Sequence, residues 1–151
     1  MGELQQENVR LARRWFEEVW NQRRAQTAHE LLLPESVGHT EHGDLVGPGP
    51  FLEVRAALLA ALPDLRVSVE DTVAEGDNVV VRWSAVGTPA GAAGGPVRFR
   101  GMTWIRVRGG KFVEGWDAWN SGGLMLHQAA PPRGPAGQGH AGPGGAAPAR
   151  G

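Results

Sequence analysis

An aspartate flanked by tryptophans, Asp117 in the segment EGWDAWN (114–120), is the first candidate for chemistry in this sequence. The segment has the alternation of a β-strand, which places Asp117 on one face together with Gly115 and Trp119. Gly115 leaves space beside the carboxyl group, and an apolar pocket raises the pKa of a carboxylic acid toward neutrality. Asp117 is therefore predicted to be a general acid or base. The alternative is a surface acid at the edge of a strand.

Two histidines in the segment VGHTEHGD (37–44), His39 and His42, are candidates to assist this acid. At the rim of a pocket they would donate hydrogen bonds to a carbonyl or enolate oxygen. The alternative is a pair of exposed loop histidines. A metal site built from His39, His42 and Asp44 is a third reading, but its spacing falls in a glycine-flanked loop rather than on a helix. We therefore predict no metal.

The aromatic side chains are six tryptophans and four phenylalanines, with no tyrosine, so mechanisms that need a phenol donor are excluded. Several of these aromatic residues are expected to line the wall of a pocket, together with the hydroxyl group of Thr103. The residues predicted to bind a substrate are Trp20, Trp83, Phe99, Thr103 and Trp119. Core packing is the alternative for Trp20 and Trp83, because it is the more common fate of a large apolar side chain.

Helices are predicted to come first in the chain and strands after them. The 3.6-residue periodicity predicts helices over 3–24 and 50–62, and a capping box from Thr27 to Glu30 opens a short helix that Pro34 stops. Residues 35–49 are expected to form a loop. Strands are predicted over 65–76, 79–88, 97–108 and 111–120, the last two joined by a Gly109–Gly110 hairpin turn. This order predicts an α+β fold, with helices on one face of a mainly antiparallel sheet.

Composition limits the other possibilities. The 151 residues fit one domain, expected at 3–128, and the Gly/Pro/Ala-rich residues 129–151 are predicted to be a disordered tail. The net charge of −1 without a basic stripe argues against nucleic acid, and the absence of cysteine excludes disulfides and thiolate chemistry. No secretory signal or membrane-spanning run is present, so a cytoplasmic protein is expected, with no membrane partner.

Four segments together carry a family resemblance: WFEEVWN, GPGPFLEVRAAL, LPDLRVSVEDTVAEGDNVVVRWSAVGT and FRGMTWIRVRGGKFVEGWDAW. Their order and spacing resemble the SnoaL-like polyketide cyclase (ester cyclase) family of the NTF2-like superfamily, over about residues 8–127. The resemblance implies a cone of about three helices on a strongly curved sheet that encloses an apolar pocket. It implies that Asp117 is the acid–base group of an intramolecular aldol condensation on a polyketide-like aromatic substrate, with no cofactor. It also implies a homodimer through the outer sheet face, where Trp104 lies among arginines.

The chain departs from the family pattern at three places around the candidate site. Some relatives carry a polar side chain where this chain has Gly101, a histidine is frequent at Pro89, and many have a second acid at Asn120. Thr103, with the two histidines, is left to steady a developing oxyanion. The thinned set of polar groups keeps two alternatives open. One is a non-catalytic small-molecule-binding module, and the other is a related hydrating or hydroxylation-assisting enzyme.

Overall fold

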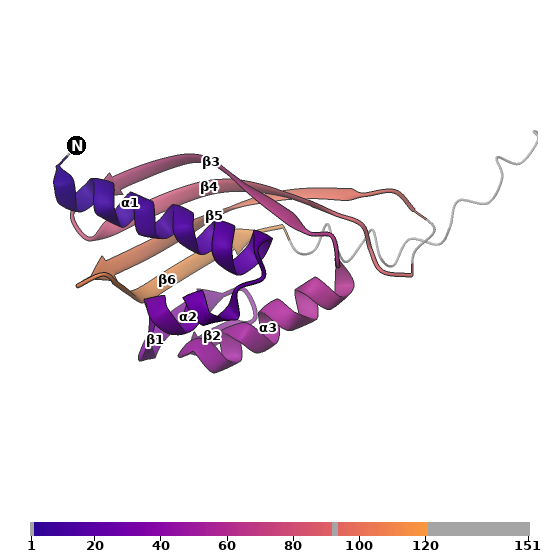
Figure 1. Cartoon of the computed structure of the whole chain (residues 1–151), viewed down its shortest axis with the longest axis horizontal. Helices are drawn as coiled ribbons and strands as arrows, with labels where there is room; N and C mark the ends of the chain where they lie inside the picture. The colour runs from indigo at the N-terminus through magenta and orange to yellow at the C-terminus, as the bar shows by residue number, and fades with distance from the viewer. Residues whose placement is uncertain (1, 92–93, 121–151) are drawn as a thin grey trace, which may run out of the picture.

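The computed structural model describes residues 2–91 and 94–120, which form helices on one side of a single sheet (Figure 1). The helical elements are α1 (Glu3–Trp15), the π-helix η1 (Phe16–Asn21) that continues it, α2 (Ala25–Leu31) and α3 (Pro48–Ala61). The strands are β1 (Leu32–Thr40), β2 (Gly43–Val46), β3 (Arg66–Glu75), β4 (Asn78–Gly87), β5 (Val97–Arg108) and β6 (Lys111–Trp119).

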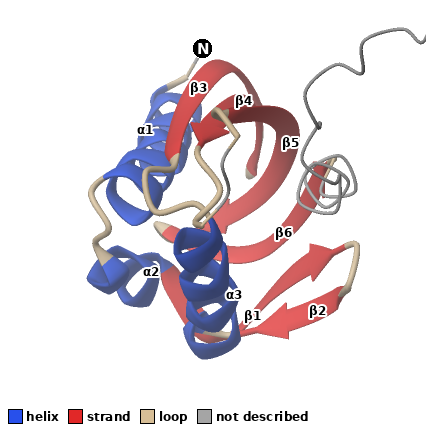
Figure 2. Ribbon diagram, turned by 90° about the vertical axis from the view of Figure 1, so that its right-hand side faces the viewer, coloured by secondary structure: helices blue, strands red, loops and turns tan. Residues whose placement is uncertain are grey.

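The six strands form one mixed sheet in the order β2-β1-β6-β5-β4-β3. All neighbours are antiparallel except β1 and β6, which run parallel. Helix α1 packs on β3 and β4, and α3 packs on β1 and β2 (Figure 2). The predicted α+β fold is therefore confirmed. We call the sheet face that the helices cover the inner face, and the opposite face the outer face. The strong curvature of the sheet, which the family resemblance implies, remains a prediction.

The first helix turns its apolar stripe toward the sheet. Leu11, Ala12 and Trp15 are buried, and Phe16 and Val19 continue the stripe through η1. Asn21, at the end of η1, accepts a hydrogen bond from the Val67 backbone N–H (2.8 Å) and donates one to its carbonyl (2.8 Å). This side chain thus fixes the end of η1 against β3 and holds the preceding residue, Trp20, in place.

Arginine side chains hold the carbonyl groups at the end of η1. Arg55 of α3 is buried, and its Nε donates to the Val19 carbonyl at 2.9 Å, while Arg23 donates to the Trp20 carbonyl. Cations at a helix C-terminus meet carbonyls that lack a partner within the helix. The pKa of Arg55 is lowered by burial and, to a smaller extent, by Arg23. The Arg55 contact ties α3 to η1, the two helical walls of the site described below.

Two local predictions in the first half of the chain were wrong. The second helix begins at Ala25 rather than after a Thr27 cap, and Thr27 is buried within it, where it donates to Glu18 (3.2 Å). The expected loop over 35–49 contains most of β1 and all of β2. Hydrogen bonds to neighbouring strands override its weak local β-propensity. Ser36 bridges a register shift there, because its Oγ donates to the Phe112 carbonyl and accepts from the Leu33 N–H.

The second half of the chain follows the predicted pattern. The strands β3 to β6 match the predicted ones to within one residue at each end. Gly109 and Gly110 have φ angles of +55° and +75°, the left-handed conformation that a tight hairpin turn requires. The predicted tail, residues 129–151, lies outside the described residues. No helix among residues 2–91 and 94–120 is long and apolar enough to span a membrane.

Candidate functional site

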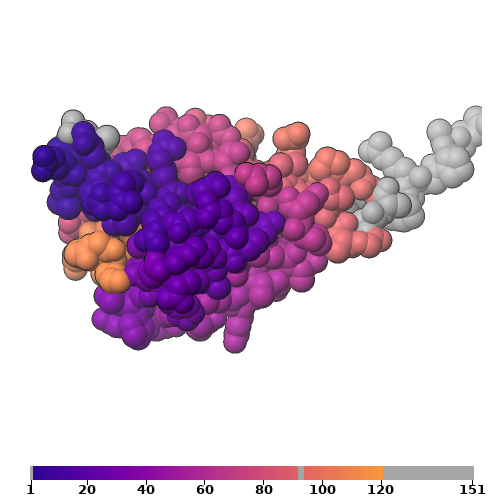
Figure 3. Space-filling view, viewed as in Figure 1, coloured from indigo at the N-terminus to yellow at the C-terminus, as the bar shows by residue number. Residues whose placement is uncertain are grey.

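A cavity of about 290 Å³ lies between the helices and the inner face of the sheet. Its walls are mostly apolar, with Trp15, Phe16, Trp20 and Phe51 on the helical side. In the space-filling view the helices cover this inner face (Figure 3). The cavity can therefore take an apolar molecule and shield much of it from water.

Aromatic rings make up two opposing walls of this cavity. On the helical side, the Phe51 ring lies 4.8 Å from that of Trp15 and 5.9 Å from that of Trp20. On the sheet side, the Phe99 ring lies 6.1 Å from that of Trp83 and 5.2 Å from that of Trp119. Rings on two walls suit a flat, unsaturated ligand, because offset and edge contacts between rings are favourable.

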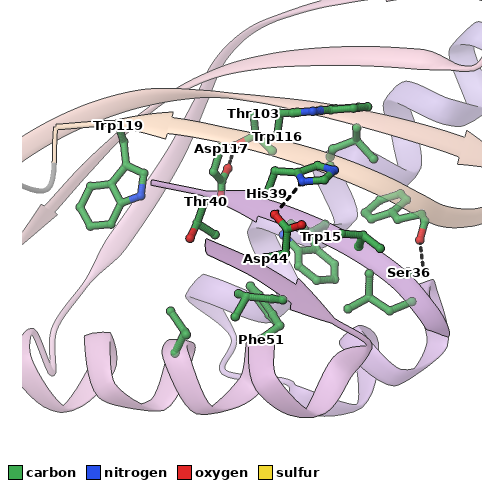
Figure 4. A pocket seen from close by; sticks show the side chains of 18 of the residues that line it. Trp15, Ser36, His39, Thr40, Asp44, Phe51, Thr103, Trp116, Asp117 and Trp119 are labelled. Carbon is green, nitrogen blue, oxygen red and sulfur yellow. Dashed lines mark hydrogen bonds and ion pairs between the residues drawn. The ribbon is translucent and has the colours of Figure 1, made fainter. Parts of the chain in front are cut away.

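Asp117 projects into this cavity from β6, beside Trp119 and facing Phe51 of α3 (Figure 4). The strand register places it opposite Thr103 of β5, whose Oγ1 donates a hydrogen bond to Asp117 Oδ1 at 2.5 Å. Burial raises the pKa of Asp117, and the Thr103 hydrogen bond opposes that rise. By accessible surface Asp117 is nevertheless an exposed residue, and it lines the cavity. The carboxyl group is thus desolvated by the surrounding protein and still open to a ligand.

A second hydrogen bond leads to the Thr103 hydroxyl from β4. The indole Nε1–H of Trp83 donates to Thr103 Oγ1 at 3.0 Å. Trp83, Thr103 and Asp117 therefore form a continuous chain across three neighbouring strands. The sequence reading treated Trp83 and Thr103 as separate ligand-binding residues and missed this connection.

Gly101 is a site residue whose role the sequence reading also missed. A Cβ atom at this position would lie 2.6 Å from Cζ2 of Trp83 and 2.6 Å from Cβ of Trp119. Glycine therefore lets these two side chains come together over β5. By contrast, a Cβ atom at Gly115 would have only the Trp104 carbonyl oxygen within 4 Å, at 3.5 Å, an ordinary contact distance. Gly101 lies directly between Trp83 of β4 and Trp119 of β6 in the strand register. A glycine paired with a tryptophan on each side was the feature that could have indicated this role.

His39 also borders the cavity, but its side chain lies on the face of the sheet opposite to that of Asp117 (Figure 4). In the parallel register it pairs with Trp116, and its ring stacks on the Trp116 ring at 5.4 Å. Side chains alternate along a strand, so Trp116 and Asp117 point to opposite faces. His39 and Asp117 therefore border the same cavity, but the register directs their side chains to opposite faces of the sheet.

Both ring nitrogens of His39 are engaged by carboxylates. Nδ1 lies 2.8 Å from Asp44 Oδ1, and Nε2 lies 2.8 Å from Glu114 Oε2. Glu114, and then Asp44, raises the pKa of His39. Arg106 donates to the other Glu114 oxygen at 2.9 Å, which extends the network onto β5. His39 thus joins β1 to both β2 and β6.

The other predicted site residues are accounted for at the cavity. His42, in the turn between β1 and β2, borders it with a side chain that is 83% exposed and 3.2 Å from Glu41. All the residues predicted to bind a substrate line it: Trp20, Trp83, Phe99, Thr103 and Trp119. In the described part of the chain, no cluster of three or more His, Cys, Asp or Glu side chains is arranged to hold a metal ion.

Comparisons with known proteins agree with this architecture. Residues 10–127 match the profile of the SnoaL-like polyketide cyclase family. A proposed SnoaL-like polyketide cyclase from Jannaschia sp. CCS1 has a similar structure, with a TM-score of 0.80, 24% identity and coverage of 87% of this chain and 98% of that one. IdmH, a proposed polyketide cyclase from Streptomyces antibioticus, superposes with a TM-score of 0.71 at 25% identity, over 82% of this chain and 99% of its own.

A third solved structure supports the fold assignment alone. An NTF2-like protein from Burkholderia pseudomallei K96243 matches with a TM-score of 0.72 at 14% identity, over 82% of this chain and 98% of that one. The fold is therefore the NTF2-like α+β fold. The search among curated proteins found no match.

Proposed function

Because this chain belongs to the SnoaL-like polyketide cyclase family, we propose that it closes a ring in a flat, polyketide-like aromatic substrate by aldol-type acid–base catalysis. The observation that carries the proposal is the Asp117 carboxyl group, held by Thr103 and open to an aromatic-walled cavity. Proton transfer and carbon–carbon bond formation within one molecule need no cofactor.

The proposed reaction uses Asp117 first as a base and then as an acid. The carboxylate takes a proton from a carbon next to a carbonyl group, and the resulting enolate attacks a second carbonyl carbon of the same molecule. The new alkoxide then recovers the proton from Asp117, so the aldol product has the mass of the substrate. A carboxyl group does both jobs best when its pKa lies near the working pH, which is the direction in which burial moves Asp117.

The histidines take different parts in this proposal. His42 is proposed to donate a hydrogen bond to a substrate carbonyl at the cavity mouth, where its ring is accessible. His39 is proposed to act through the cavity wall, because its two nitrogens already bind Asp44 and Glu114. By joining β2 to β6 through β1, it holds the hairpin that borders the cavity.

The test is Asp117→Asn on a verified substrate. Aromatic polyketides that quench tryptophan fluorescence are identified first, and mass spectrometry follows the fate of each binder. The variant is expected to keep the fold and the ligand affinity but to lose about 100- to 10,000-fold in turnover, the usual contribution of a general acid or base. Asp71→Asn, an exposed acid on β3, is the matched control and should turn over normally. Full turnover by Asp117→Asn would remove Asp117 from the mechanism.

A non-catalytic binding module is the second candidate. It is favoured by the mostly apolar surface of the cavity wall. It predicts fluorescence quenching with no product at all. A hydrating or hydroxylation-assisting enzyme would instead give a product heavier than its substrate, so the mass of the product distinguishes the three functions.

We also propose a homodimer through the outer face of the sheet. Met102 and Trp104 of β5 are 50% and 44% exposed there. The Trp104 ring packs on that of Trp116 at 5.1 Å, and the Arg106 guanidinium lies 5.1 Å from the Trp116 ring centre. Tryptophan, methionine and arginine are the side chains enriched in protein–protein interfaces.

A further inference from the structure

A chain of two hydrogen bonds leads from Trp83 through Thr103 to one oxygen of Asp117, and the chemistry of the groups fixes the direction of each bond. An indole N–H can only donate, so the Thr103 hydroxyl must accept the bond from Trp83. A hydroxyl group has a single proton, and that of Thr103 is directed to Asp117 Oδ1, 2.5 Å away. The order of donation is therefore Trp83 to Thr103 to Asp117.

The two carboxyl oxygens of Asp117 are consequently not equivalent. Oδ1 accepts the Thr103 bond, so a proton added to the carboxylate belongs on Oδ2. Among the described residues, no hydrogen bond to Oδ2 is found, and the carboxyl group borders the cavity. The free oxygen is the one that a substrate can reach.

We propose that Trp83 and Thr103 are positioning residues that hold Asp117 Oδ1 as an acceptor and so make Oδ2 the oxygen that exchanges a proton with the substrate. This role rests on the proposed function of Asp117. It replaces the expectation that Thr103 stabilises an oxyanion, because the single hydroxyl proton is already donated. Trp83 matters because its N–H occupies one lone pair of Thr103 Oγ1 and so restrains the rotation of the hydroxyl group.

Gly101 is the third component of this arrangement. The indole of Trp83 passes so close to Gly101 that its Cζ2 would lie 2.6 Å from any Cβ there. Cζ2 is next to the ring carbon that carries Nε1, so the position of this edge also sets the position of the donor. A side chain at position 101 would push the indole away from Thr103. Gly101 is therefore needed for the hydrogen bonds that position Asp117.

The first test measures the proton on Asp117 without any substrate. The carboxyl carbon of Asp117, assigned by its loss in Asp117→Asn, is titrated by ¹³C NMR in the wild type, Thr103→Val, Thr103→Ser and Trp83→Phe. A hydrogen bond to the charged form lowers a carboxyl pKa, so Thr103→Val is expected to raise the pKa of Asp117 above the wild-type value. Thr103→Ser keeps the hydroxyl and should stay close to wild type. Trp83→Phe should give a smaller rise, because the hydroxyl remains but is less restrained.

A second readout needs no change at Thr103. The ¹H–¹⁵N resonance of the Trp83 indole should shift with pH at the midpoint of the Asp117 titration, and this shift should vanish in Asp117→Asn. An unchanged Asp117 pKa in Thr103→Val overturns the proposal. So does an indole resonance of Trp83 that does not respond to Asp117, even where Thr103→Val folds poorly.

Kinetics on a verified substrate then separate positioning from binding. Thr103→Val should lower kcat by about 10- to 100-fold, as for the loss of one charge-assisted hydrogen bond, and leave KM within about twofold. Its kcat–pH profile should move in the direction of the NMR shift, and Thr103→Ser should restore both. A raised KM with an unchanged kcat would make Thr103 a binding residue and refute its positioning role. If Asp117→Asn is fully active while the wild type and the Thr103 variants show the expected NMR shifts, the proposed function alone is refuted.

Discussion

Replacing Gly101 by alanine is expected to destabilise the protein, although glycine in a strand is ordinarily less stable than alanine. A Cβ atom at this position would lie 2.6 Å from a ring carbon of Trp83, 2.6 Å from Cβ of Trp119 and 2.7 Å from the Ala118 carbonyl oxygen. Two of these atoms are backbone or next to backbone and cannot move independently of β6. Overpacking of this kind costs about 1–3 kcal/mol. That exceeds the gain of roughly 0.5–1 kcal/mol that alanine brings in a strand.

Gly115→Ala is the matched control, because it lies on the same face of the neighbouring strand. Its Cβ would meet nothing closer than a carbonyl oxygen at 3.5 Å, so alanine should be neutral or slightly stabilising there. Urea denaturation at constant m-value gives the two free energies of unfolding, and thermal scans should show a loss of roughly 3–5 °C per kcal/mol for Gly101→Ala. Equal stabilities of the two variants would show that the sheet relaxes around position 101, and the close-packing argument would fail.

Two further predictions concern the outer face. His39 has a pKa raised by Glu114 and Asp44, so its contribution to stability is complete below its unfolded-state pKa, about 6.5, and is lost as the pH rises through the raised folded value. The difference in unfolding free energy between wild type and His39→Gln should therefore shrink as the pH rises through that window, as measured by urea denaturation at several pH values. His42→Gln, which changes an exposed side chain, is the control. Trp104→Glu should convert the proposed dimer to a monomer in light scattering at micromolar concentration, whereas Leu4→Glu, on α1, should not; a wild-type monomer would end the dimer proposal.

The strands of the second half were predictable because their signals are local. Strict alternation over 97–108, followed by a Gly-Gly turn and a partner strand, defines a hairpin without reference to the rest of the chain. The same alternation placed Asp117 on one face with Gly115 and Trp119, and the structure has this arrangement at the cavity. The role of Asp117 is a separate question, which only the variants above can answer.

The β1–β2 hairpin was not predictable by the same reasoning. Strand β1 pairs in parallel with β6, more than seventy residues away, and a parallel partner leaves no signature in the residues that flank a turn. Its sequence, LLPESVGHT, contains a proline and a glycine that lower its local strand signal. The face of His39 depended on that missing register, since a shift by one residue moves every side chain to the other side of the sheet.

Two opposing influences act on the pKa of Asp117, and together they suit one carboxyl group to serve as both base and acid in a mostly apolar cavity. Burial alone would favour the protonated form, which cannot take a proton from carbon. The Thr103 hydrogen bond favours the charged form, and the Trp83 donor keeps that bond in one direction. A polar side chain at position 101 could not coexist with this indole, because the space is already filled by Trp83 and Trp119. The glycine at 101 and the indole donor at 83 are therefore one coupled feature, and a change at either position should alter the pKa of Asp117 in the same direction.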